Sequence, residues 1–180
     1  MAGLSDPVLW YVDRGSGLVA LMLLTGSVVL GIVSVARVHS PAWPRFALAQ
    51  LHRNLALLAL VFGVVHVFTS VIDSYVPITL ADAAIPFAAA YKPFWLALGT
   101  ISADLMLAVL ITTALRRRIG FQTWRSIHLL SYACWGASAV HSVGIGSDAR
   151  SAVWGVMIIA TCVGAVAGAL VQRTAPAHPH

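Results

Sequence analysis

Charged residues are scarce in this sequence. Only 9% of its 180 residues are charged, 59% are hydrophobic, and glutamate is absent altogether. The mean hydropathy is +0.88, whereas about 25% of the residues in a soluble globular domain are charged. The composition therefore excludes an ordinary soluble protein and predicts an integral membrane protein in contact with lipid. In such a chain the net charge of +5 reports membrane topology, and we predict no nucleic-acid partner.

Cysteine is also rare, and its placement excludes two kinds of site. Cys134 and Cys162 both lie in apolar stretches, without a CxxC pair and without the CxxCH sequence that attaches heme covalently. We expect two reduced thiols that act as small apolar side chains. Any heme in this protein would therefore lack thioether links and be of the b type.

Long apolar stretches, in contrast, are frequent. A membrane-spanning helix needs about 20 apolar residues at about 1.5 Å of rise each, and five stretches meet that requirement. They cover approximately residues 15–36, 49–72, 94–115, 126–145 and 152–171. The sequence therefore predicts an all-α integral membrane bundle of about five transmembrane helices. We expect a single domain over residues 1–173 and a flexible C-terminal tail over residues 174–180.

Arginine gathers in two of the connections between these stretches. The connection after the first stretch carries Arg37, Arg45 and Arg53, and the connection after the third carries residues 116–118 and Arg125. By the positive-inside rule both connections are cytoplasmic, which places the N-terminus outside and the C-terminus in the cytoplasm. The sequence, rich in arginine and alanine, favours a bacterial inner membrane.

The outer connection over residues 74–93 is too long for a tight turn. Pro77, Pro86 and Pro93 interrupt it, and its middle is apolar and rich in alanine. Two interpretations stay open, a short helix over residues 80–90 in the outer membrane interface and an irregular loop.

Four histidines within the apolar stretches form a pattern. His52 and His66 lie 14 residues apart in the second stretch, and His128 and His141 lie 13 apart in the fourth, which runs in the same direction. Fourteen residues are about 21 Å and about 3.9 turns of helix, so His66 returns to the face of His52 at another depth. No i, i+4 pair is present to close a cage around one metal ion. One imidazole from each of two helices at each level is instead the arrangement that two hemes require.

The 13-residue spacing requires a distortion of the fourth helix. It equals about 3.6 turns of a regular helix, which would rotate His141 away from the face of His128. We therefore predict that this helix is overwound, bent or broken between the two histidines. Ser131, Gly136 and Ser138 are the candidate positions.

Other polar residues lie near the levels of these histidines. Arg53 and Arg125 are expected at the inner level, where they could pair with heme propionates or anchor the inner membrane face. Lys92 and Arg150 are the basic residues available at the outer level. Asp104, deep in the third stretch, could orient a ligand imidazole, relay protons, or bond a neighbouring serine or threonine.

Two glycines could let a flat macrocycle approach the backbone. These are Gly63, one turn before His66, and Gly136, between His128 and His141. Ordinary small-residue packing between helices explains either of them equally well.

The segments LHRNLALLALVFGVVH and WRSIHLLSYACWGASAVH resemble the ferric reductase-like transmembrane family. That family includes NADPH oxidases, metalloreductases and the heme subunit of a bacterial methionine sulfoxide reductase. The resemblance covers approximately residues 50–148. It implies two hemes b between the second and fourth helices, an inner one ligated by His52 and His128 and an outer one ligated by His66 and His141.

Two departures from that family shape what is expected of partners. The NADPH oxidases have six membrane helices where five are predicted here, and the sequence shows no flavin or nicotinamide domain. We therefore expect an oxidoreductase subunit that exchanges electrons with a separate partner, either a quinol or a flavoprotein. Whether the subunit catalyses a reaction of its own is not predicted.

The resemblance implies a di-heme cytochrome b that transfers electrons across the membrane. The donor would be a cytoplasmic protein or a quinol, and the acceptor ferric iron, dioxygen, a quinone or a flavoprotein outside. The direction of flow comes from the resemblance alone. The alternatives are a heme-binding sensor or delivery protein, and a proton or metal transporter that uses the histidines and Asp104.

Overall fold

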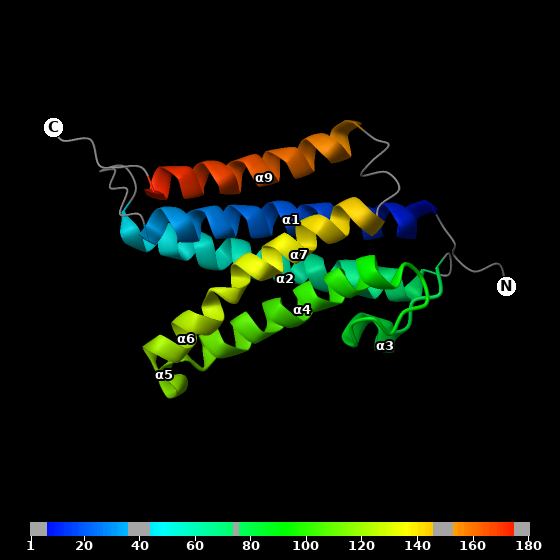
Figure 1. Ribbon diagram of the computed structural model, residues 1–180, viewed down its shortest axis with the longest axis horizontal. Helices are drawn as coiled ribbons and strands as arrows, with labels where there is room; N and C mark the ends of the chain where they lie inside the picture. The colour runs from blue at the N-terminus through cyan, green and yellow to red at the C-terminus, as the bar shows by residue number, and fades with distance from the viewer. Residues whose placement is uncertain (1–6, 36–43, 74–75, 146–152, 175–180) are drawn as a thin grey trace.

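The computed structural model describes residues 7–35, 44–73, 76–145 and 153–174, and within them every regular element is a helix. The helices are α1 (Pro7–Val35), α2 (Arg45–Ile72), α3 (Leu80–Ala84), α4 (Pro93–Ala114), α5 (Arg116–Ile119), α6 (Phe121–His128), α7 (Leu130–Ile145) and α9 (Val153–Thr174) (Figure 1). The predicted all-α class is therefore confirmed.

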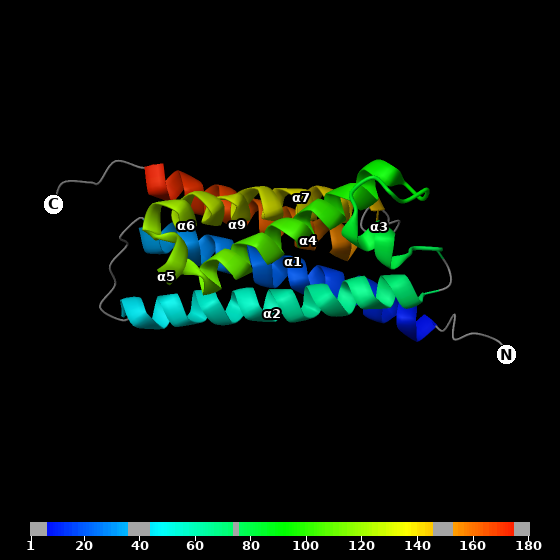
Figure 2. The same ribbon diagram turned by 90° about the horizontal axis from the view of Figure 1, so that it is seen from below.

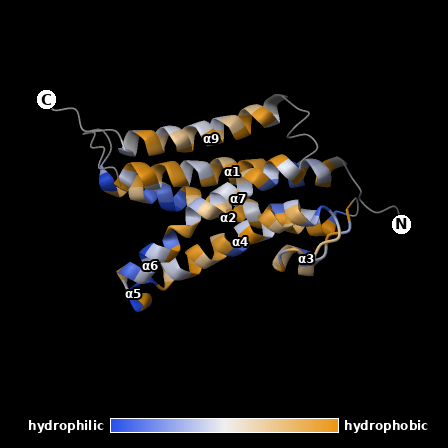
Figure 3. Cartoon of the chain, viewed as in Figure 1, coloured by the Kyte–Doolittle hydropathy of each residue, from blue (hydrophilic) through white to orange (hydrophobic). Residues whose placement is uncertain are grey.

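Three of these helices, α1, α2 and α4, are long and apolar enough to cross a membrane. Only 11% of the most apolar window of α2 is buried inside the protein, so most of its apolar side chains face outward. Figure 3 shows hydrophobic residues along the long helices and hydrophilic ones gathered around α5 and α6. Outward apolar side chains on helices that satisfy their own backbone groups are typical of proteins embedded in lipid.

Helix α1 is the central element of the bundle. It packs along α2 on one side and along α9 on the other, and it also contacts α7, which packs on α4. Figure 2 shows α2 at one edge of the bundle, beside α1. The core between α1, α7 and α9 includes a cluster of four buried side chains, Leu21, Ala139, Ile159 and Cys162. Cys134 and Cys162 are buried free thiols, as predicted.

The fourth apolar stretch is two helices rather than one. Helix α6 ends at His128 and α7 begins at Leu130, with a turn at Leu129 between them. The backbone amide of Tyr132 donates to the carbonyl of Leu129 over 3.2 Å, an i to i+3 bond that tightens the chain. The predicted interruption between His128 and His141 is confirmed. Its predicted positions are wrong, because Ser131, Gly136 and Ser138 all lie inside α7.

The connection between α2 and α4 contains a short helix, which agrees with one of the two interpretations of the sequence. The side chain of Thr79 accepts from the amide of Asp82 at 3.2 Å, and the carboxylate of Asp82 accepts from the amide of Thr79 at 2.8 Å. This reciprocal pair starts α3, which ends at Ala84, earlier than expected. The segment after it is irregular, with Phe87 at a positive φ of 67°. Helix α3 is held to α4 by Thr100, whose hydroxyl donates to the carbonyl of Asp82 over 3.1 Å.

A close approach of α4 to α7 at Gly144 gives a first prediction. A Cβ atom at Gly144 would lie 1.8 Å from Cε3 of Trp95, so the ring would have to move. We expect Gly144→Ala to lower the free energy of unfolding by about 1–3 kcal/mol through overpacking. Thermal unfolding in detergent micelles measures the change. Gly136→Ala is the control in the same helix, because nothing lies within 4 Å of its Cβ position. Equal stability of the two variants would contradict the prediction.

Candidate functional site

The structure brings the four membrane histidines together as two pairs. The imidazole centroids of His52 and His128 are 6.1 Å apart, and those of His66 and His141 are 6.3 Å apart. His52 and His66 extend from α2, His128 is the last residue of α6, and His141 lies in α7. The turn at Leu129 lies between the last two, so both meet α2 despite their 13-residue spacing. These are the predicted pairs, in which each histidine of α2 lies beside the histidine at the same depth in α6 or α7.

Three of the four imidazoles are oriented by a main-chain carbonyl. Each Nδ1 atom lies 2.8–2.9 Å from a backbone oxygen of a neighbouring helix. The pairs are His52 with Ser27, His66 with Asp13, and His141 with Trp95. Because a carbonyl can only accept, each Nδ1 carries the hydrogen and each neutral ring keeps its lone pair on Nε2. Three Nε2 atoms are thereby prepared to bind a metal.

Each accepting carbonyl is followed four residues later by a glycine against which the imidazole lies. We call such a pair a carbonyl–glycine seat, and the three seats are Asp13 with Gly17, Ser27 with Gly31, and Trp95 with Gly99. A Cβ atom would lie 3.0 Å from the ring at Gly17, 3.6 Å at Gly31 and 2.6 Å at Gly99. The absence of a side chain therefore gives the imidazoles of His66 and His141 their room.

The two seats on α1 match the histidines of α2. Gly17 and Gly31 are 14 residues apart, as are His52 and His66. The two helices lie side by side, so equal spacings place each glycine beside one imidazole at each depth. Neither seat was predicted. The equal spacing of glycines and histidines is the signal by which the sequence could have indicated them.

His128 is held differently from the other three. Its Nδ1 atom is buried and has no hydrogen-bond partner among the described residues. Its ring instead stacks on Trp124, with centroids 4.9 Å apart and planes at 28°. The indole of Trp124 donates to Thr113 over 3.2 Å, and the guanidinium of Arg116 lies 4.3 Å from its ring. Helix α4 contains one glycine, Gly99, so it has no second glycine to form a seat for His128.

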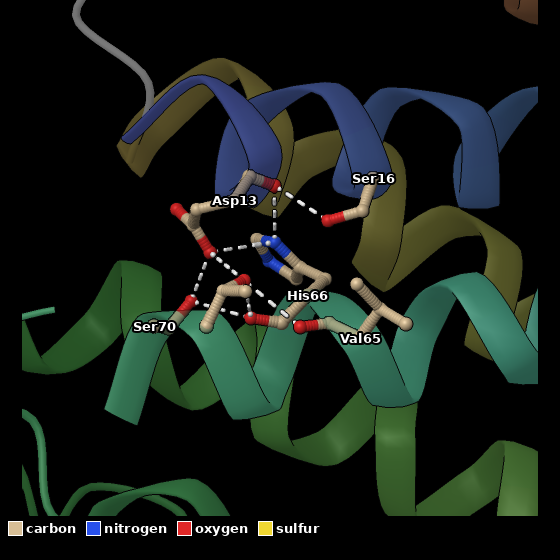
Figure 4. Close-up of polar contacts among 6 residues, drawn as sticks. Asp13, Ser16, Val65, His66 and Ser70 are labelled. Atoms are coloured by element: carbon tan, nitrogen blue, oxygen red, sulfur yellow. Dashed lines mark hydrogen bonds and ion pairs between the residues drawn. The ribbon is translucent and has the colours of Figure 1, made fainter. Parts of the chain in front are cut away.

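One acidic side chain contacts a paired imidazole. Oδ1 of Asp13 lies 3.1 Å from Nδ1 of His66, and it also accepts from the hydroxyls of Ser70 and Thr69 (Figure 4). Asp13 was not predicted, because an acid near the start of a span is normally part of the membrane interface. Of the three interpretations open for Asp104, the orienting contact with an imidazole is not found among the described residues. Asp104 is exposed on α4, and no described imidazole bonds to it.

The basic residues expected near these levels do not contact the described histidines. Arg53 is exposed and donates to Gln50 over 3.0 Å, and Arg125 is also exposed. Nζ of Lys92 donates to the carbonyl of Ile145 over 3.3 Å, which ties the start of α4 to the end of α7. Arg150 lies outside the described residues. The propionate roles of these residues stay predictions.

The two glycines considered from the sequence do not touch the histidines. A Cβ atom at Gly63 would meet Met106 of α4 at 3.2 Å, and one at Gly136 would meet nothing within 4 Å. The positions that matter to the imidazoles are those of the seats.

The chemistry open to each pair follows from its ligand count. In the part of the chain that the structure describes, no group of three or more histidine, cysteine, aspartate or glutamate side chains converges on one point. A structural or catalytic zinc site needs three or four such ligands. Two imidazoles that share a metal, each about 2 Å from it, have centroids about 6 Å apart. Both pairs have that separation, and among the described residues each offers two imidazole ligands to a metal.

Comparison with known proteins gives a family but no function. A search of curated proteins found no match, and a search of solved structures found none either. The family model of a domain of unknown function, DUF8596, matches residues 8–148. The matched segment contains all four paired histidines, Asp13 and the three seats, and it covers well over half of the chain. The chain therefore belongs to the DUF8596 family.

Proposed function

We propose that this protein is a di-heme cytochrome b that transfers electrons across a membrane. The observation that carries the proposal is the double pair of imidazoles, two at each of two depths, with centroids 6.1 and 6.3 Å apart. A low-spin heme b would need two ligands from the protein, and a pair of imidazoles would supply them. The residues present fit that need, because each pair offers two side chains and three of the four Nε2 atoms are left free by their Nδ1 bonds.

Each histidine pair would hold one heme, and the seats would orient the imidazoles. His52 and His128 would hold the inner heme, and His66 and His141 the outer one, where the iron supplies reversible one-electron reduction. The seats fix the tautomer and the direction of three of the rings, as carbonyl partners do for metal-bound histidines. His52 and His66 are about 21 Å apart along α2, which spans most of a hydrocarbon core of about 30 Å.

The proposal includes five membrane crossings. In addition to α1, α2 and α4, helices α7 and α9 would cross, since both are apolar and lie along α1 (Figure 1). The arginine-rich connections would lie in the cytoplasm of a bacterial cell, with the start of α1 outside. The partners would be a quinol or a flavoprotein on one side and an acceptor on the other, as in the ferric reductase-like proteins that the sequence resembles.

The transporter alternative loses its main support from the position of Asp104. A proton or metal relay would need this carboxylate near the histidines, and it lies on the exposed side of α4. A heme-binding sensor or delivery protein would use the same ligands, and rapid reduction of both hemes by a quinol or a reduced flavoprotein would argue against it.

The experiment that tests the proposal is the heme content of the purified protein. We expect about two hemes b per chain and a reduced-minus-oxidised spectrum of low-spin iron with two imidazole ligands. The pyridine hemochrome assay gives the ratio, and electron paramagnetic resonance of the oxidised protein gives the ligation. A ratio of one or none after heme supplementation would refute the two-site arrangement.

The contact of Asp13 with His66 leads to a prediction about the outer heme. A carboxylate at Nδ1 makes the imidazole a more electron-rich ligand and stabilises ferric iron. Asp13→Asn should raise the reduction potential of the outer heme by roughly 50–100 mV, because one nearby charge at a dielectric constant of about 20 would contribute roughly 1–2 kcal/mol to the stability of the ferric state. Redox titration followed by absorbance measures both hemes, and the inner heme is the internal control. Equal shifts of the two would contradict a local effect of Asp13.

A further inference from the structure

Asp104 is an acidic side chain near the middle of a membrane-spanning helix. It follows Pro93, the first residue of α4, by 11 residues and precedes Ala114, the last, by 10. At about 1.5 Å per residue it lies roughly 15 Å from either end of the helix, near the centre of a hydrocarbon core about 30 Å thick. The other charged residues described in α1, α2 and α4 lie nearer to helix ends.

The side of α4 that carries Asp104 faces away from the bundle. Gly99 lies against His141, and the hydroxyl of Ser102 donates to the carbonyl of Cys134 in α7 over 3.0 Å. Asp104 stands five residues after Gly99, about 140° further around the helix. Leu107 and Ile111 lie on the same side and are 53% and 49% exposed. We call these three residues the Asp104 face.

Helix α3 covers this side of α4 only at its outer end. Thr100, one turn before Asp104, is buried, and its hydroxyl donates to the carbonyl of Asp82. The cover ends there, because Asp104, Leu107 and Ile111 are all exposed. None of the described side chains forms a hydrogen bond or an ion pair with Asp104. The Asp104 face is thus an apolar helix surface with one acid at mid-membrane depth.

A carboxylate at this depth is costly unless a partner satisfies it. Placing an aspartate at the centre of a membrane helix costs about 3 kcal/mol on insertion scales, and such residues pair with another polar group in nearly all membrane proteins. We infer that the Asp104 face binds a transmembrane helix of another protein, which places a lysine, arginine or histidine opposite Asp104. The inference is independent of the proposed heme function.

A second copy of this chain fits the Asp104 face less well. A two-fold contact along this face would bring the two Asp104 side chains toward one another, and like charges in a low dielectric repel strongly. The described basic residues of α1, α2 and α6 lie toward the helix ends, and α4 contains none, so these helices of a second copy would offer Asp104 no cation at this depth. Charge complementarity therefore favours a different chain with a basic residue in its span.

Designed membrane peptides test the inference directly. The full-length protein, labelled with a donor dye, is placed in phosphatidylcholine vesicles with acceptor-labelled polyleucine helices. One peptide has a single central arginine, a second has that arginine near one end, and a third has none. We expect energy transfer to show at least tenfold tighter association with the central-arginine peptide. Asp104→Leu and Asp104→Asn should each remove that preference.

The controls separate a specific contact from misfolding and from self-association. Asp82→Asn changes an acid in α3 and should keep the preference, and unchanged thermal unfolding would show that the Asp104 variants are folded. Equal association of all three peptides with the unaltered protein would overturn the inference. Energy transfer between two labelled copies of this chain that disappears in Asp104→Leu would also overturn it, because the occupant would then be a second copy. Heme content plays no part in either readout.

Discussion

Replacing His66 or His141 by alanine should remove one low-spin heme and leave the other. Each variant would lose one of the two imidazoles proposed to hold the outer heme, while His52 of the inner pair lies about 21 Å away along α2. We expect the ratio of low-spin heme to protein to fall from about two to about one in either variant. His52→Ala and His128→Ala should remove the inner signal instead. The hemochrome ratio and the paramagnetic resonance spectrum together identify which heme remains.

Double variants make this prediction sharper. His66→Ala combined with His141→Ala should lose no more heme than either change alone, because both residues serve one site. His66→Ala combined with His52→Ala should lose both hemes, because the residues serve different sites. His178→Ala, outside the predicted pairs, is the control. Greater loss in the first double variant than in its single variants would show that the pairs are assigned wrongly.

Gly99→Ala should empty the proposed outer heme site although it replaces neither of the proposed ligands. The added methyl group would lie 2.6 Å from Cε1 and 2.7 Å from Nδ1 of His141, so the ring must leave its place and give up its bond to the carbonyl of Trp95. We expect loss of the low-spin outer signal and a decrease of about 1–3 kcal/mol in the free energy of unfolding. Heme content and thermal unfolding of the same preparation measure the two effects.

The other seats give a graded series for comparison. The methyl of Gly17→Ala would lie 3.0 Å from the His66 ring, which requires a small shift, whereas that of Gly31→Ala would lie 3.6 Å from His52, an ordinary contact. Heme loss should therefore decrease from Gly99 to Gly17 to Gly31. Gly15→Ala is the matched control on α1, since its Cβ would meet nothing within 4 Å. Equal loss at Gly31 and Gly99 would show that the steric argument is wrong.

The pairing of the histidines could be predicted because it depends on spacing alone. Helical rise converts the separations of 14 and 13 residues into depth, and the shorter one requires an interruption that the structure places at Leu129. Its position could not be predicted, because leucine has no backbone preference that breaks a helix. Serine and glycine were favoured on propensity, yet Ser138 bonds across to Ser102 of α4 and stays within α7.

The direction of Asp104 could not be predicted from hydropathy. Helix α4 is apolar on all sides, so its sequence gives the depth of the carboxylate but not the side that it faces. Asp13 was overlooked for the opposite reason. It lies near the start of α1, where an acid is ordinary, and only the packing of α1 against α2 brings it to His66. The side that Asp104 faces and the contact of Asp13 with His66 both depend on how the helices pack, which the sequence alone does not give.

The seats also determine where substitutions are tolerated in this protein. Their hydrogen-bond acceptors are main-chain oxygens, which every amino acid supplies, so exchanging the residue that accepts the bond leaves the acceptor in place. The demand for one residue type falls four positions later, on Gly17 and Gly99, which form no hydrogen bond to the ring but leave it the space that a Cβ atom would take. A saturation scan of α1 and α4 would therefore show its intolerant positions displaced by one helical turn from the residues that hold the imidazoles. The positions that such a scan marks as intolerant would be those that leave space for each ring, and the residues whose carbonyls orient the rings would tolerate substitution.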